Sequence, residues 1–175
     1  LQCSANNFGA LGFNMTPSAR MDQPGMARLQ FSTADPYAHA ILGLQIADPL
    51  FIAIRQTAEI SGVNNPADRL YPGLDLKLRL LKEAARRPAV SLGLQSAIGH
   101  KRMAGEYLVL SKRYNNFDFS GGLAWGRLGS AGHIDNPLKS VLSHFGGDRP
   151  PDGEFPNGPE DWFTGEEAGF FGGIE

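Results

Sequence analysis

The sequence has little cysteine, few charges and no long hydrophobic run, and each of these absences excludes a class of protein. A single cysteine, Cys3, among 175 residues excludes a disulfide framework and a zinc site with four thiolate ligands. The 16 basic and 18 acidic residues give a formal charge of −2, which argues against a nucleic-acid-binding protein, because such proteins carry a strongly basic surface. The densest apolar run, residues 50–54, ends at Arg55, far short of the roughly 18 apolar residues that a membrane-spanning helix needs.

What the sequence does contain is glycine, phenylalanine and a regular alternation of apolar and polar residues. Glycine accounts for 22 residues, roughly twice the usual share of about 7%. The hydrophobic fraction of 42%, with 11 phenylalanines, excludes a wholly disordered chain. In residues 74–80 every even position is leucine, and the odd positions are Asp75, Lys77 and Arg79. This period of two predicts a strand with one apolar and one polar face.

Similar alternation, separated by turn signals, predicts nine strands in a single domain that covers residues 1–175. The expected strands are residues 8–15, 28–33, 38–46, 50–58, 74–80, 90–95, 106–114, 117–127 and 168–174. Residues 78–87 also fit a short helix. Residues 129–167, rich in Gly, Pro, Asp and Asn, predict a long irregular loop with a helical turn near 138–145. The fold class is therefore all-β, an antiparallel up-and-down meander.

Two architectures fit this meander, a transmembrane β-barrel and a soluble β-sandwich. Several of the predicted strands are about 9–11 residues long, which is the length of barrel-spanning strands. Charges in mid-strand suit a wet lumen if the leucine rows meet lipid, but a soluble sandwich could bury those rows and expose the charges. Bacterial single-chain barrels have even strand numbers, so nine strands predict an incomplete barrel that further strands must close. The alternative is a soluble periplasmic β-sandwich that binds glycan.

The candidate contact residues lie on the polar faces of the predicted strands and in the long loop. Aromatic side chains of the loop could stack on sugar rings, with carboxylates accepting hydrogen bonds from sugar hydroxyls. The candidates for lining a lumen or contacting glycan are Arg55, Asp75, Lys77, Arg79, Arg113 and Trp162. For each residue of the strand faces, plain exposure to solvent is the competing interpretation. For Trp162, the competing interpretation is a loop that packs its own aromatics.

No pattern predicts an enzyme, a metal site or a cofactor site. The four histidines lie at spacings that do not suit metal ligation, and the glycine pairs lack the strand–helix context of a phosphate loop. Asp148, Asp152 and Glu160 could in principle form a glycosidase carboxylate pair, but their Pro- and Gly-rich context favours solvated loop charges. Cys3 resembles a lipidation site only faintly, because Gln2 stands where a small residue is expected.

Several short sequence segments resemble the YjbH family of outer-membrane proteins and occur in the family's order. This family is tied to exopolysaccharide production and capsule loci. The segments are residues 15–20, 75–81, 91–95, 106–113, 117–119, 125–129 and 168–175. The resemblance implies a non-catalytic outer-membrane β-barrel in a cell-envelope polysaccharide pathway. Its implied partners are polysaccharide, other envelope proteins of that pathway and outer-membrane lipid, with no nucleic acid. Because family members are considerably longer, the sequence resembles an N-terminal portion.

Overall fold

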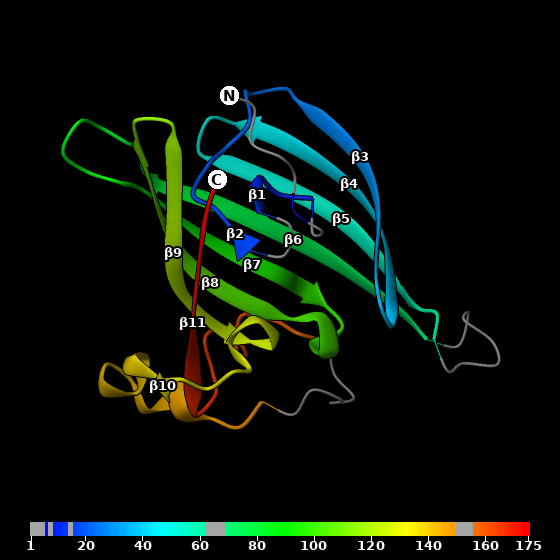
Figure 1. The fold of residues 1–175 in the computed structure, drawn as a ribbon. Coiled ribbons are helices and arrows are strands. Elements are labelled where there is room, and N and C mark those ends of the chain that lie inside the picture. The colour runs from blue at the N-terminus through cyan, green and yellow to red at the C-terminus, as the bar shows by residue number, and fades with distance from the viewer. Residues whose placement is uncertain (1–5, 7–8, 14–15, 62–68, 150–155) are drawn as a thin grey trace.

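The computed structural model describes residues 6, 9–13, 16–61, 69–149 and 156–175, and a large antiparallel sheet dominates them (Figure 1). The sheet order is β10-β11-β9-β8-β7-β6-β5-β4-β3. Its strands are β3 (Ala27–Ala34), β4 (Tyr37–Ala47), β5 (Leu50–Glu59), β6 (Leu70–Leu81), β7 (Ala89–Gly99), β8 (Gly105–Tyr114), β9 (Phe117–Gly126), β10 (Ile134–Asp135) and β11 (Glu167–Ile174). From β3 to β9 each strand pairs with the next in the chain, which confirms the predicted meander.

Two of the expected elements are wrong. Of the expected strand 8–15 the structure describes residues 9–13, and these do not join the large sheet; instead β1 (Gly12–Phe13) and β2 (Thr16–Pro17) form a separate two-stranded ladder. Residues 78–87 form no helix, because β6 continues to Leu81 and Ala84 then pairs with Arg87 in an isolated antiparallel bridge. The short strand β10, inside the expected loop, restores the count of nine in the large sheet.

The remaining connections contain short 3-10 helices. They are η2 (Lys101–Met103), η3 (Arg127–Gly129), η4 (Pro137–Ser140) and η5 (Ser143–Gly146). The helices η4 and η5 lie where the loop was expected to make a helical turn. Among the described residues, no helix is long and apolar enough to cross a membrane.

The outer, convex face of the sheet is apolar and exposed. Strand register aligns one large apolar side chain from each of six neighbouring strands in a continuous row: Leu50, Leu78, Leu92, Leu108, Leu123 and Phe170. Toward the β3 edge, Phe31 is 73% exposed, and Ile54 in β5 is 65% exposed. Contiguous exposed apolar surface of this kind marks contact with a partner or a membrane. No second sheet of described residues covers these rows, as the sandwich alternative would require.

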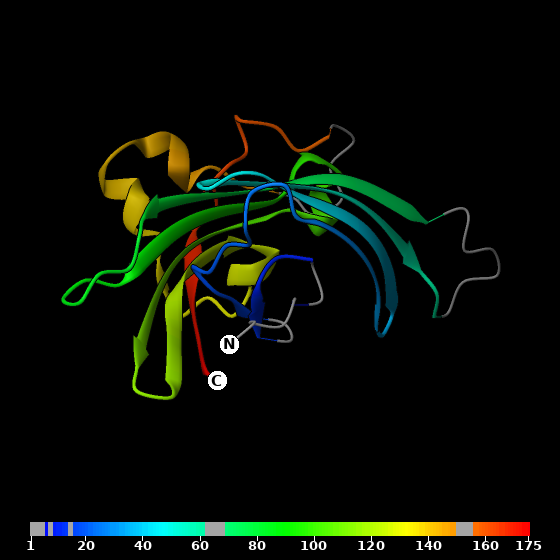
Figure 2. The same ribbon diagram turned by 90° about the horizontal axis from the view of Figure 1, so that it is seen from above.

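The concave face is polar and covered. Figure 2 shows the sheet curving as an arc, with the N-terminal segment in its hollow. Residues 9–13 and 16–22, here called the strap, lie against strands from both halves of the sheet. Ala10 and Met21 of the strap pack with Ile41 and Phe51, while Ala19 packs with Tyr107. The strap thus forms an inner layer over the polar face.

The sheet is not closed within the described residues, because β3 and β10 end it on opposite sides. Only β4 pairs with β3, and β10 is a two-residue strand that pairs with the start of β11. The antiparallel meander is therefore confirmed, whereas the expected barrel, predicted to be incomplete in this chain, is not confirmed by an open sheet.

Glycines inside the strands make room for aromatic rings of the neighbouring strand. Gly93 lies directly opposite Tyr107, and a Cβ added at Gly93 would lie 2.0 Å from Cζ of that ring. Phe171 likewise lies opposite Gly122, where an added Cβ would be 2.9 Å from Cζ of the ring and 2.0 Å from a backbone oxygen. Glycine usually weakens a strand, but at these two positions a side chain would displace its neighbour.

We expect Gly93→Ala to lower the free energy of unfolding by about 1–3 kcal/mol, because the new methyl group forces the Tyr107 ring out of its buried position. The measurement is a denaturant unfolding curve of the purified protein. Gly121→Ala is the matched control, since its Cβ would meet only the Phe171 carbonyl oxygen at 3.6 Å, an ordinary contact. Equal losses in the two variants would contradict the steric explanation.

Candidate functional site

A network of hydrogen-bonded polar side chains lies on the concave face of β4, β5 and β6. Arg55 is 1% exposed, and its guanidinium group donates two hydrogen bonds to the Asp75 carboxylate, at 2.8 and 2.9 Å. A third donor of Arg55 reaches the Thr57 hydroxyl at 3.1 Å, and Nδ1 of His39 lies 2.8 Å from that hydroxyl. The backbone N–H of Ser96 also donates to Asp75. Bidentate pairing of this kind is what makes buried charges tolerable.

Lys77 fastens the strap to the centre of the sheet. Its buried ammonium group donates to the carbonyl oxygens of Arg20 at 2.6 Å and Leu11 at 3.3 Å. One strand further, the Ser91 hydroxyl donates to the Ala19 carbonyl at 3.1 Å. The Ser111 hydroxyl accepts a 2.7 Å hydrogen bond from the Ala19 N–H. Side chains of three adjacent strands thus form hydrogen bonds with backbone groups of the strap.

Arg20 ties the strap to the turn after β6 and to the start of β9. It donates twice to Asp118, at 2.8 Å each, and once to Glu83 at 2.5 Å. Partial burial raises the pKa of the Glu83 carboxyl, but hydrogen bonds from Arg20, from the Arg113 backbone N–H and from Lys112 outweigh that effect. The pKa of Glu83 consequently falls to about 2. The end of the strap is held by ion pairs on two sides.

At the other end of the arc, the connection between β9 and β11 folds over the outer face. Glu106 has the outward parity of the apolar residues in β8, yet it is fully buried. Arg149 explains this, because it donates two hydrogen bonds to the Glu106 carboxylate, at 2.6 and 2.8 Å. Asn136 anchors the same connection by accepting from the Trp125 indole N–H at 2.8 Å. The long connection is therefore a fixed cover at this end of the sheet.

The structure places five of the six predicted contact residues on the same face of the sheet. Arg55, Asp75, Lys77, Arg79 and Arg113 share the inward parity of their strands. Three of them, Arg55, Asp75 and Lys77, are buried.

Two of these five lie near turns and form ion pairs there. Arg79 pairs with Asp48 at 2.5 Å, and Arg113 pairs with Asp118 at 3.1 Å. Hydrogen bonds from Arg79 and Lys82 lower the pKa of the exposed Asp48 carboxyl.

Trp162 lies apart from the other candidates. Its indole N–H donates to the Ala97 carbonyl at 2.9 Å and so ties the connection to β7. Cys3, Asp152 and Phe155 lie outside the described residues. Contact of the six candidates with glycan stays a prediction.

Sequence reasoning missed Arg20, Glu83, Glu106 and Arg149. The alternation in β8 places Glu106 among the outward residues. Its charge in an otherwise apolar row is the only local sign that it needs a basic partner. No local signal links Arg20 to Asp118, because they are far apart in the chain. Among the described residues, no group of three or more His, Cys, Asp or Glu side chains is arranged to hold a metal ion.

These features define a class of protein: an antiparallel β-sheet with an apolar outer face and a charged inner face covered by its own N-terminal strap. The chain belongs to the YjbH family, since the family model described as "Exopolysaccharide biosynthesis protein YbjH" matches residues 4–175. It is 36% identical over 149 residues to the Escherichia coli (strain K12) protein named "Uncharacterized lipoprotein YjbH". That alignment covers 81% of this chain and 21% of the relative, so the chain spans about a fifth of the relative's length. No solved structure matches the chain.

We expect Lys77→Met to loosen the strap, because the carbonyls of Leu11 and Arg20 lose their buried donor. Leaving such groups unsatisfied costs about 1–3 kcal/mol. Hydrogen exchange followed by mass spectrometry should show faster exchange in peptides from residues 9–22. Lys139→Met, a change of the same kind in η4, should leave that exchange unchanged. Equal protection of the strap in both variants would show that Lys77 does not anchor it.

We expect Glu83→Gln to flatten the acid dependence of stability. The folded pKa of Glu83, about 2, lies below its ordinary value, so the carboxylate stabilises the fold above that ordinary value. This contribution is lost as the pH falls toward 2. Unfolding curves between neutral pH and pH 2 should show a smaller loss in the variant than in the wild type. Glu160→Gln, at an exposed carboxylate, is the control and should keep the wild-type slope.

Proposed function

We propose that this chain forms part of an outer-membrane β-barrel that supports the production, export or surface assembly of an exopolysaccharide. The observation that carries the proposal is the distribution of side chains across the sheet. Large apolar residues face outward in continuous rows, and charged residues face inward and are paired. A water-soluble protein gains stability from the opposite arrangement. A lipid surround makes this arrangement favourable.

Strand length and the open edges fit the same proposal. The seven strands from β3 to β9 have 8–12 residues, close to the roughly 9–11 residues of a tilted membrane-spanning strand. An open sheet edge in lipid would leave backbone N–H and C=O groups unsatisfied. Strands beyond those described would therefore pair with β3 and β11 to close the barrel.

The role in polysaccharide production rests on the family and on the chemistry of the inner face. The description of the matching family names exopolysaccharide biosynthesis. The E. coli relative is named a lipoprotein, which supports a place in the cell envelope. Paired charges and hydroxyls on the inner face offer hydrogen bonds to sugar hydroxyls. We propose a non-catalytic role, as a passage, anchor or scaffold. Its partners would be the polysaccharide, outer-membrane lipid and other envelope proteins of the pathway.

The test is a charge placed on the outer face. We expect Ile54→Arg, in the middle of β5, to reduce the amount of full-length protein in outer-membrane fractions. An arginine facing lipid near the bilayer midplane costs about 2–4 kcal/mol. Val141→Arg is the matched control, since Val141 is 68% exposed and Ile54 65%, but Val141 lies outside the sheet.

The measurement is density-gradient fractionation of cell envelopes, with immunoblotting of the full-length protein. Loss of Ile54→Arg from the outer-membrane fraction, with Val141→Arg retained there, is the expected result. Recovery of the wild-type protein in soluble periplasmic extract would overturn the proposal. An Ile54→Arg variant that fractionates as the wild type does would also overturn it. That result would mean that residue 54 faces water, where a charge is tolerated.

A further inference from the structure

A pocket of about 550 Å³ lies where η2, η3 and the start of β11 meet. Its size is within the range of small-molecule sites, roughly 300–1,000 Å³. The pocket lies at one end of the arc, next to the turns that follow β7 and β9, and adjoins the concave face. None of the six candidate contact residues lines it.

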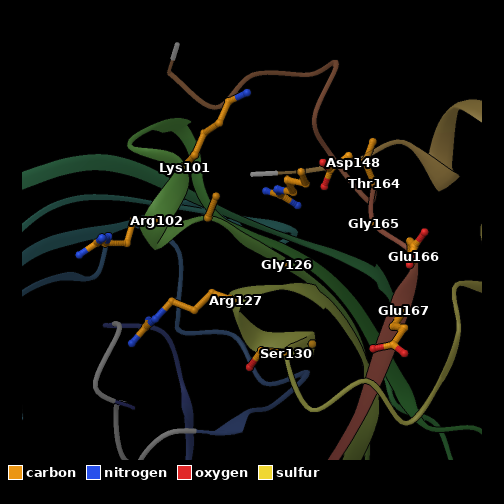
Figure 3. Close-up of a pocket in the computed structure, with 13 residues that line it drawn as sticks. Lys101, Arg102, Gly126, Arg127, Ser130, Asp148, Thr164, Gly165, Glu166 and Glu167 are labelled. Atoms are coloured by element: carbon orange, nitrogen blue, oxygen red, sulfur yellow. The ribbon is translucent and has the colours of Figure 1, made fainter. Parts of the chain in front are cut away.

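The two sides of the pocket carry different chemistry (Figure 3). Glu166 and Glu167 lie at the start of β11, with Asp148 nearby, whereas Arg102 and Arg127 extend to the opposite side. Among the described residues, no ion pair engages the side chains of these three acids. Ser130 adds a hydroxyl that can both donate and accept hydrogen bonds.

The basic side chains are held in place by their own contacts. Arg149 is fixed by its two hydrogen bonds to Glu106, and Lys101 Nζ lies 3.0 Å from Asp161. The guanidinium groups of Arg102 and Arg127 each lie 5.7 Å from the centre of a tyrosine ring on the concave face. Donors that are already oriented lose little entropy when a ligand binds.

The balance of charge disfavours an acidic ligand. Each of Lys101, Arg102 and Arg149 already has a carboxylate partner, whereas three further carboxylates line the cavity. Four basic residues line the cavity against these three acids, but the fourth, Arg127, has its guanidinium over the Tyr37 ring. The three carboxylates are therefore the lining charges that the described side chains leave unpaired. A ligand that suits this lining must both donate hydrogen bonds to carboxylates and accept them from ammonium, guanidinium and hydroxyl groups. Sugar hydroxyls do both, and an amino sugar adds a positive charge that faces the acids.

We propose that this pocket binds a short segment of a non-acidic glycan, with its hydroxyl or amino groups on Glu166 and Glu167. The inference rests on the proposed role in polysaccharide production and gives that role a binding site and a ligand class. None of the described residues that line the pocket is aromatic, so the described lining offers no ring face for stacking and predicts weak binding. Weak binding at the end of the polar face suits a glycan that must be released again.

The test measures the binding of defined oligosaccharides to the purified full-length protein in detergent by isothermal titration calorimetry. The probes are a neutral glucan oligosaccharide, an oligoglucosamine and an oligogalacturonate of equal length. We expect the first two to bind and the oligogalacturonate not to bind. Glu166→Gln with Glu167→Gln should weaken binding of the oligoglucosamine about tenfold, through the loss of charge-assisted hydrogen bonds. Ser130→Trp should weaken the binding of the glucan oligosaccharide and of the oligoglucosamine, because the indole ring fills the cavity.

Glu160→Gln is the matched control, an exposed carboxylate outside the lining, and should bind as the wild type does. The inference is overturned if neither non-acidic probe binds, if only oligogalacturonate binds, or if the pocket variants bind unchanged. Fractionation of the same variants separates this failure from failure of the proposed function. A protein that stays in the outer membrane but binds neither non-acidic probe overturns the pocket alone. A protein recovered soluble overturns the membrane role.

Discussion

A charge on the covered face of a single sheet is tolerable only when a neighbouring group compensates it, and the inner side of this protein follows that requirement. Arg55 is neutralised by Asp75 within the sheet itself, whereas Lys77 depends on carbonyl oxygens of the strap. Arg20 of the strap in turn depends on Asp118 of β9. An isolated buried charge would be far costlier than any of these contacts. Sheet and strap therefore stabilise one another mainly through polar contacts, with two small apolar clusters between them.

The outer face follows from the same alternation. Because successive side chains of a strand point to opposite faces, a sheet that turns its charges inward must turn its leucines outward. Strand register then aligns these leucines across six strands into rows rather than scattered positions. In an environment that accepts these outward apolar rows, the hydrophobic effect contributes little to packing inside the arc. This explains why the strap is held by hydrogen bonds and why glycine–aromatic contacts, such as Gly93 with Tyr107, carry much of the inner packing.

The sequence was enough to predict most strands and the residues that share a face, because a period of two links Asp75, Lys77 and Arg79 without any knowledge of their partners. The pairing of Arg55 with Asp75 also needs the register between β5 and β6, which alternation does not determine. Residues 8–15 resemble a strand in composition, but residues 9–13 belong to the strap. Its true place depends on contacts such as that of Ala19 with Ser111, which no local pattern encodes. Burial of Glu106 likewise depends on a connection folding back from a distant part of the chain.

The polar nature of the inner layer determines how firmly the strap is held on this face. A hydrogen bond that exchanges one polar partner for another changes the free energy by only about 0.5–1.5 kcal/mol. An apolar plug would lose far more on leaving its place, since buried apolar area is stabilised by about 25 cal/mol per Å². The strap offers three carbonyl oxygens and one N–H to the ammonium group of Lys77 and the hydroxyls of Ser91 and Ser111. Lys77, Ser91 and Ser111 therefore hold the strap through several hydrogen bonds that each contribute little.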